Sequence, residues 1–134
     1  MGQTTSFDAV VKALRMLKRI RRLDGTLLIH EGVMLSADNR LSDEQNSAFV
    51  REVNAMVALY RNGDRPFRRM ILGFDGGNVI LFNVAPFTLA LFFENIEEAV
   101  VVEKQGEEFL STWADSLQIT GAATIELPAL TAET

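Results

Sequence analysis

Residues 70–93 read MILGFDGGNVILFNVAPFTLALFF and decide the fold, because three apolar runs are separated only by short turn signals. The runs predict strands over residues 67–74, 78–84 and 87–93. Asp-Gly between two such runs is a strong hairpin signal, since tight hairpin turns need positive φ. A phosphate-binding loop would instead have to open a helix, and here both flanks are strand-like. Gly76-Gly77 is therefore predicted to turn the chain rather than to bind a nucleotide.

The residues around this meander predict three helices and two further strands. Before it we expect, in order, a helix over 7–22, strands over 26–30 and 33–37, and a helix over 42–61 capped by Ser42. After it we expect a last helix capped by Asn95 and ending near residue 117. A strand near residue 100 stays open as an alternative, because the valine run there and Gly106 are poor helix formers.

The order α-β-β-α-β-β-β-α predicts an α+β fold, an α/β sandwich built on one five-stranded antiparallel sheet. Residues 78–84 are apolar on both faces, so both faces of the sheet must be covered. We expect two helices on one face and one on the other, and the single helix leaves apolar area for a partner. The 134 residues predict one domain over 1–117 and a C-terminal tail over 118–134, flexible or partner-bound.

Charge is distributed unevenly along the chain, whose net charge is −5. Residues 1–72 hold twelve Lys and Arg against eight Asp and Glu, whereas residues 73–134 hold one lysine against ten acids. Six of the cations lie in Lys12–Arg22, a basic helix of the kind that faces nucleic acid or an anionic membrane. Because the protein is acidic, we expect this helix to lie beside the acidic C-terminal segment instead.

Residues that could carry chemistry are few. The one histidine, His30, has only Glu31 beside it and is expected to be a turn residue, and no serine lies in a GxSxG context. The chain has no cysteine and no apolar run of the roughly 20 residues that span a bilayer. We therefore expect no enzyme activity, no catalytic residue, no cofactor and no metal site, and a cytoplasmic protein.

The chain resembles the roadblock (dynein light-chain) domain family over residues 7–117. The resemblance rests on the element order, on LDGTLLIHEGVMLSADN at residues 23–39 and on the meander at residues 70–93. After the meander this chain has Asn95-Ile-Glu-Glu and a valine run where the family commonly has small residues. The resemblance implies a profilin-like or longin-like sandwich. It also implies an adaptor that forms homodimers or heterodimers and binds a small Ras-like GTPase, sometimes promoting GTP hydrolysis.

In this family the third strands pair across the dimer and the second helices lie side by side. For this chain the resemblance implies a dimer interface at Phe49, Val53, Met56, Val57, Tyr60, Arg69, Met70, Ile71 and Leu72. The apolar edge strand supports this expectation, because an open edge pairs readily with another strand. The exposed side of the paired helices is expected to bind the partner through Arg40, Arg51, Glu52 and Arg61.

Arg65, Arg68 and Arg69 at the edge strand are interpreted as solvated or salt-bridged charges, with an arginine finger for GTP hydrolysis as the sharper alternative. Two other functions stay open. One is a small acidic dimeric secretion chaperone that binds an effector segment. The other is a module that senses a small ligand. We expect no nucleic-acid partner, no membrane span and no peripheral membrane association.

Overall fold

The computed structural model describes the backbone of residues 2–62, 68–74, 76–84 and 86–117, and the side chains of residues 8–60, 68–74, 76–84 and 86–113. The predicted C-terminal tail and one residue of each predicted turn in the meander lie outside these ranges. The elements are α1 (Gly2–Arg21), β1 (Gly25–His30), β2 (Val33–Asp38), α2 (Asp43–Asn62), β3 (Arg69–Phe74), β4 (Gly77–Val84), β5 (Phe87–Phe93), a 3₁₀ turn η1 (Ile96–Glu98) and α3 (Ala99–Leu117). The predicted order of elements is confirmed.

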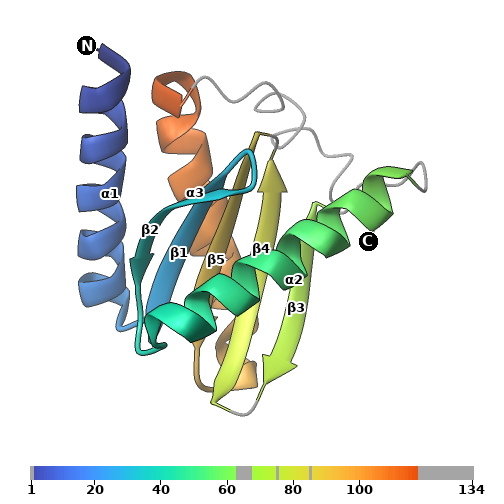
Figure 1. The fold of residues 1–134 in the computed structure, drawn as a ribbon. Helices are drawn as coiled ribbons and strands as arrows, with labels where there is room; N and C mark the ends of the chain where they lie inside the picture. The colour runs from blue at the N-terminus through green and yellow to red at the C-terminus, as the bar shows by residue number, and fades with distance from the viewer. Residues whose placement is uncertain (1, 63–67, 75, 85, 118–134) are drawn as a thin grey trace.

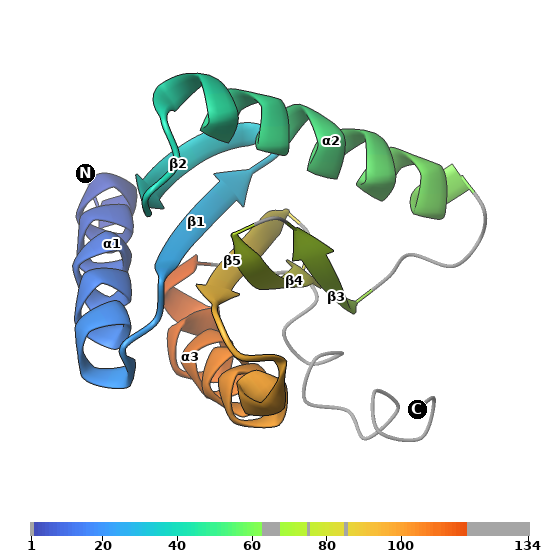
Figure 2. The same ribbon diagram turned by 90° about the horizontal axis from the view of Figure 1, so that it is seen from below.

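The five strands form one sheet in the order β2-β1-β5-β4-β3, and every neighbouring pair is antiparallel. Helices α1 and α3 cover one face of the sheet, and α2 runs obliquely across the other (Figures 1 and 2). This confirms the predicted α+β sandwich with two helices on one side and one on the other. Strands β2 and β3 form the two edges of the sheet.

The core consists of two apolar layers separated by the sheet. Phe82 and Leu91 belong to the layer under α1 and α3, whereas Leu81 and Phe92 belong to the layer under α2. Every residue of β5 is buried. The central strands are therefore apolar on both faces, as their sequence predicts, and each face requires its own helical cover.

Both predicted hairpins form where the glycines lie. Phe74 pairs with Gly77, so β3 and β4 are joined by a two-residue turn. Gly77 has φ 150°, and a Cβ there would lie 2.8 Å from the carbonyl oxygen of Phe93, so glycine is required for the approach to β5. Between β1 and β2, Glu31 and Gly32 both have positive φ, which matches the two-residue hairpin turn.

The start of α2 follows the capping pattern read from the sequence. The backbone N–H of Gln45 donates to Ser42 Oγ at 3.1 Å, and the N–H of Ser42 donates to Gln45 Oε1 at 2.9 Å. The last helix differs from the prediction, because Asn95 makes no side-chain cap hydrogen bond and a 3₁₀ turn precedes α3. The alternative of a strand near residue 100 is wrong, since Ala99–Leu117 is continuous helix.

Gly106 explains why a poor helix former lies inside α3. A Cβ at this position would collide with the ring of Phe82 and lie 3.1 Å from Leu91 Cδ1. Its hydrogen atom lets the helix backbone approach β4 and β5 closely. The requirement for close packing therefore outweighs the lower helix propensity of glycine.

Replacing Gly106 with alanine tests this close approach. We expect Gly106→Ala to lower the free energy of unfolding by about 1–2 kcal/mol, because overpacking costs more than the roughly 1 kcal/mol that alanine gains in helix propensity. Lys104→Ala is the control on the same helix, since the side chain of Lys104 is exposed and its removal changes no close packing. Chemical denaturation of the two variants measures the difference, and a Gly106→Ala variant as stable as the wild type would contradict the packing.

Candidate partner-binding surface

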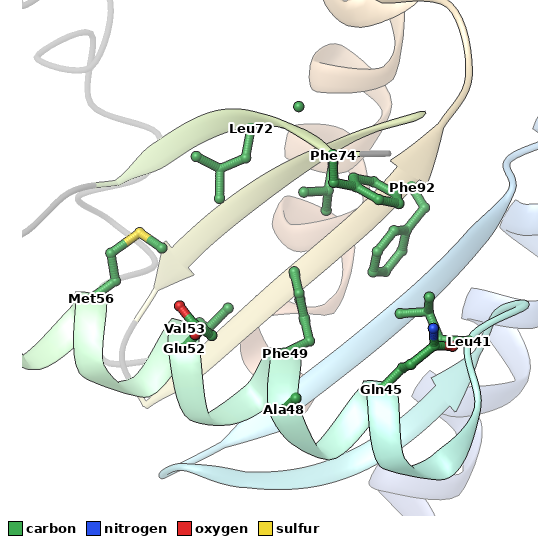
Figure 3. A pocket seen from close by; sticks show the side chains of 12 residues that line it. Leu41, Gln45, Ala48, Phe49, Glu52, Val53, Met56, Leu72, Phe74 and Phe92 are labelled. Carbon is green, nitrogen blue, oxygen red and sulfur yellow. The ribbon is translucent and has the colours of Figure 1, made fainter. Parts of the chain in front are cut away.

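An apolar groove lies between α2 and the β3 side of the sheet. Its volume is about 370 Å³. Figure 3 shows side chains of α2 and of the sheet converging on it. From α2 and the loop before it come Leu41, Gln45, Ala48, Phe49, Glu52, Val53 and Met56, and from the sheet come Leu72, Gly73, Phe74, Val79 and Phe92. Only Gln45 and Glu52 among these lining residues have polar side chains, so the groove is suited to contact with apolar groups.

Large apolar side chains remain exposed beside this groove and along the edge of β3. Leu59 on α2 is 69% exposed and Phe74 on β3 is 42% exposed. Ile71 on β3 is 44% exposed and lies on the sheet face opposite α2, because it alternates with Met70 and Leu72, which pack under α2. Leu59 continues the groove side of α2, because it follows Glu52 and Met56 at helical spacing. We call Leu59, Ile71, Phe74 and the groove lining the α2–β3 surface.

Strand β3 leaves one side of its backbone open. It pairs with β4, and within the described residues no strand pairs with its other side. An open edge with apolar side chains is a template for pairing with another strand. The opposite edge, β2, is more irregular, because its register with β1 shifts between Leu28 and Ile29.

The structure divides the predicted dimer residues into three groups. Val53 is fully buried against the sheet, so its side chain belongs to the protomer's own core. Phe49, Met56, Val57, Met70 and Leu72 are partly buried on the same core and keep part of their surface open. Ile71 and Tyr60 are exposed.

Arg69 lies on the opposite face of the sheet from α2. Its Nε forms an ion pair with Glu103 Oε2, and its Nη1 lies 3.1 Å from Glu107 Oε2 on α3. Arg69 is therefore salt-bridged, as one interpretation of the edge arginines expected. Its guanidinium binds carboxylates of its own protomer. Arg65 lies outside the described residues.

The predicted partner-binding residues do not form one cluster. Arg51 and Glu52 are both exposed, but successive helix residues point about 100° apart, and Glu52 lines the groove whereas Arg51 does not. Arg40 is exposed in the loop before α2, between Asn39 and Leu41. Its loop is held by Asn39, whose Nδ2 donates to Asn46 Oδ1 at 3.0 Å. The side chain of Arg61 lies outside the described part.

Sequence reasoning missed Leu59 and Phe74. Leu59 falls outside the buried helical stripe, whereas Phe74 shares its strand face with Met70 and Leu72 and lies at the end of β3 beside the Asp-Gly turn. A usable signal was present for Leu59, since it is a large apolar residue at a position that the helical stripe leaves to solvent.

The described residues show no candidate metal centre. They contain no group of three or more His, Asp or Glu that could hold a metal ion. His30 was predicted to be a turn residue, but it is the last residue of β1, and its ring packs against Phe87 with centroids 4.7 Å apart. In the same part of the chain no helix is long and apolar enough to cross a membrane.

Comparison with known proteins finds likeness in structure. No family model and no curated protein matches the chain. MglB of Myxococcus xanthus superposes with a TM-score of 0.62 at 16% identity, covering 83% of this chain and 91% of that chain. A Roadblock/LC7 domain from Streptomyces avermitilis superposes with a TM-score of 0.61 at 15% identity, covering 83% and 97%. A structure described as MglB with tetrameric arrangement gives 0.62 at 16% identity, covering 84% and 90%.

The fold and the α2–β3 surface define a small α+β module with an open edge strand and an apolar groove beside it. Its element order, sheet and helices are those of a roadblock-like domain, as the resemblance in the sequence predicts.

Proposed function

We propose that this protein is a non-catalytic, homodimeric adaptor that binds a small Ras-like GTPase in the cytoplasm. The observation that carries the proposal is the α2–β3 surface, where an unpaired edge strand lies beside exposed apolar side chains. The roadblock-like fold supports it, because the family resemblance implies both dimerisation and a GTPase partner.

In the proposed dimer, β3 pairs antiparallel with β3 of a second copy around a twofold axis. The two sheets then form one ten-stranded sheet, and the two α2 helices lie side by side over it. Pairing satisfies the open backbone groups of β3, and the contact between helices removes Leu59 and the groove lining from water. A structure of MglB described as having a tetrameric arrangement supports self-association as a property that this fold allows.

The groove belongs to the dimer contact more than to a small ligand. A ligand site usually combines an apolar pocket with a few convergent polar groups. Here the groove is open along β3, and its polar side chains are Gln45 and Glu52 at the exposed face of α2. This argues for the adaptor over the ligand-sensing module.

The GTPase is proposed to bind across the outer side of the paired α2 helices, near Arg51 and Arg40. Both side chains are exposed and lie on the side of the sheet that α2 covers. Without a described catalytic centre, the adaptor can regulate a GTPase only by binding one nucleotide state more tightly than the other. The twofold axis presents the same helical face twice, so one dimer can engage one GTPase asymmetrically.

The oligomeric state tests the first half of the proposal. We expect wild-type protein at tens of micromolar to have twice the chain mass of 14.9 kDa in light scattering. Leu59→Asp combined with Ile71→Asp should give folded monomers, because both side chains are exposed in the protomer and apolar contact would be lost. Val33→Asp with Val100→Asp is the matched control, since these residues are exposed on other elements and should leave the dimer intact.

A wild-type mass equal to that of one chain would contradict the dimer. Equal loss of the dimer in the two double variants would show that any added charge disrupts association. The α2–β3 surface would then not be the dimer contact.

Nucleotide dependence tests the second half. We expect titration with the cognate GTPase to show tighter binding of the form loaded with a GTP analogue than of the GDP form. Arg51→Glu should weaken that binding by roughly tenfold, or about 1.4 kcal/mol, because it reverses a charge at the contact. Lys104→Glu on α3 is the matched control and should bind as the wild type does. Equal affinity for both nucleotide forms would leave a scaffold and exclude a regulator.

A further inference from the structure

Helix α1 has a second stripe that faces away from the core. Its inward stripe, Val10, Ala13, Leu14 and Leu17, packs on the sheet and α3. Its outward side carries Lys12, Arg15, Met16, Arg19 and Ile20, which recur at helical spacing and are all exposed. Met16 is 53% exposed and Ile20 is 64% exposed. We call these five residues the α1 outer face.

The sequence predicts that this basic helix lies beside the acidic C-terminal segment, and α1 does lie beside α3. However, Glu103 and Glu107 of α3 form ion pairs with Arg69 on β3. The ion pair from α1 joins Lys18 to Asp38 on β2, with Nζ and Oδ1 3.0 Å apart. Among the described residues, no ion pair joins Lys12, Arg15 or Arg19 to a carboxylate.

The α1 outer face combines two features in one strip. The three cations lie along one half of it, and the two apolar side chains lie along the adjoining half. With successive helix residues about 100° apart, residues 12, 15 and 19 fall within about 60° of one another, and residues 16 and 20 fall next to them. Asp8, at the end toward the N-terminus, is the one acidic residue of α1. Cations attract acidic headgroups, and large apolar side chains beside them enter the boundary between headgroups and acyl chains.

We propose that the α1 outer face docks the protein on an anionic lipid bilayer, which reverses the expectation from the sequence that the protein has no peripheral membrane association. The acidic remainder of the molecule would be repelled by such a bilayer, so the charge asymmetry also orients the protein with α1 toward the lipid. Nucleic acid fits this face less well, because two exposed apolar side chains occupy half of it and none of its five residues is aromatic, so it offers no ring for base stacking. The proposal is independent of the dimer and of the GTPase, since it uses neither α2 nor β3.

The face lies away from the proposed dimer and GTPase contacts. Helix α1 covers the sheet near β1, on the face opposite α2, whereas β3 is at the far edge of the sheet (Figure 2). Docking through α1 would therefore leave the α2–β3 surface open. The proposed lipid contact therefore lies on a different side of the molecule from the proposed dimer and GTPase contacts.

Co-sedimentation of the full chain with vesicles tests the proposal. We expect the protein to bind vesicles that contain phosphatidylserine, and not vesicles of phosphatidylcholine alone, although its net charge of −5 would predict repulsion. Arg19→Glu should lower the partition coefficient about 30-fold, since each charge step at an anionic surface changes it about fivefold. Lys104→Glu carries the same charge change on the exposed side of α3 and should lower it by less than about threefold.

A second variant separates lipid from an acidic polymer. Met16→Gln with Ile20→Gln keeps every charge and should still weaken vesicle binding, because the apolar contact with the bilayer is lost. These side chains are exposed, so thermal melting should match the wild type. Failure of the wild type to bind phosphatidylserine vesicles, equal loss in Arg19→Glu and Lys104→Glu, or binding to polyglutamate or RNA that matches vesicle binding and ignores Met16 and Ile20 would overturn the proposal.

Discussion

Strands β4 and β5 carry large apolar side chains on both faces, and the rest of the structure follows from the need to cover them. Phe82 and Leu91 point to one layer, and Leu81 and Phe92 point to the other. Two helices cover the first face, closely enough that Gly106 has no space for a side chain. One helix covers the second face, and the groove beside β3 is the part of that face it leaves open.

This unequal cover separates the molecule into surfaces of different character. The α2–β3 surface is apolar and lies beside an unpaired strand edge. The α1 outer face is cationic. Helix α1 lies on the sheet face opposite α2 and away from β3 (Figure 2). On α3, Glu103 and Glu107 bind Arg69, so part of the acidic charge of the C-terminal half stabilises β3 inside the protomer.

Much of the fold could be predicted from local patterns, because alternation, turn residues and caps act over a few positions. The meander at residues 70–93 and the Ser42–Gln45 capping box are examples. Local sequence patterns gave a wrong prediction where a contact between residues distant in sequence determines the secondary structure. Gly106 and the valine run left a strand open near residue 100, whereas packing against Phe82 makes this segment a helix. Asn95 resembled a cap, but a 3₁₀ turn separates it from α3.

The candidate site was less predictable than the fold, since a sequence does not show which apolar residues stay exposed. Val53 matched the helical stripe expected at the interface and is fully buried, whereas Leu59 lies off that stripe and is exposed. Arg69 was expected at the same interface, yet its guanidinium turns to the far face and binds carboxylates 34 and 38 residues further along the chain. Such ion pairs depend on how the fold brings distant segments together, and the spacing of residues in the sequence does not specify this.

The edge of β3 is proposed to pair with a second copy, and amide hydrogen exchange of the wild-type protein measures this pairing. Exchange should be followed for Arg69–Phe74 and, as the other edge, for Val33–Asp38, at a low and a high protein concentration. The account predicts that protection of the β3 amides rises with concentration while that of the β2 amides stays constant. Protection of the β3 amides that does not change with concentration, up to tens of micromolar, would contradict it.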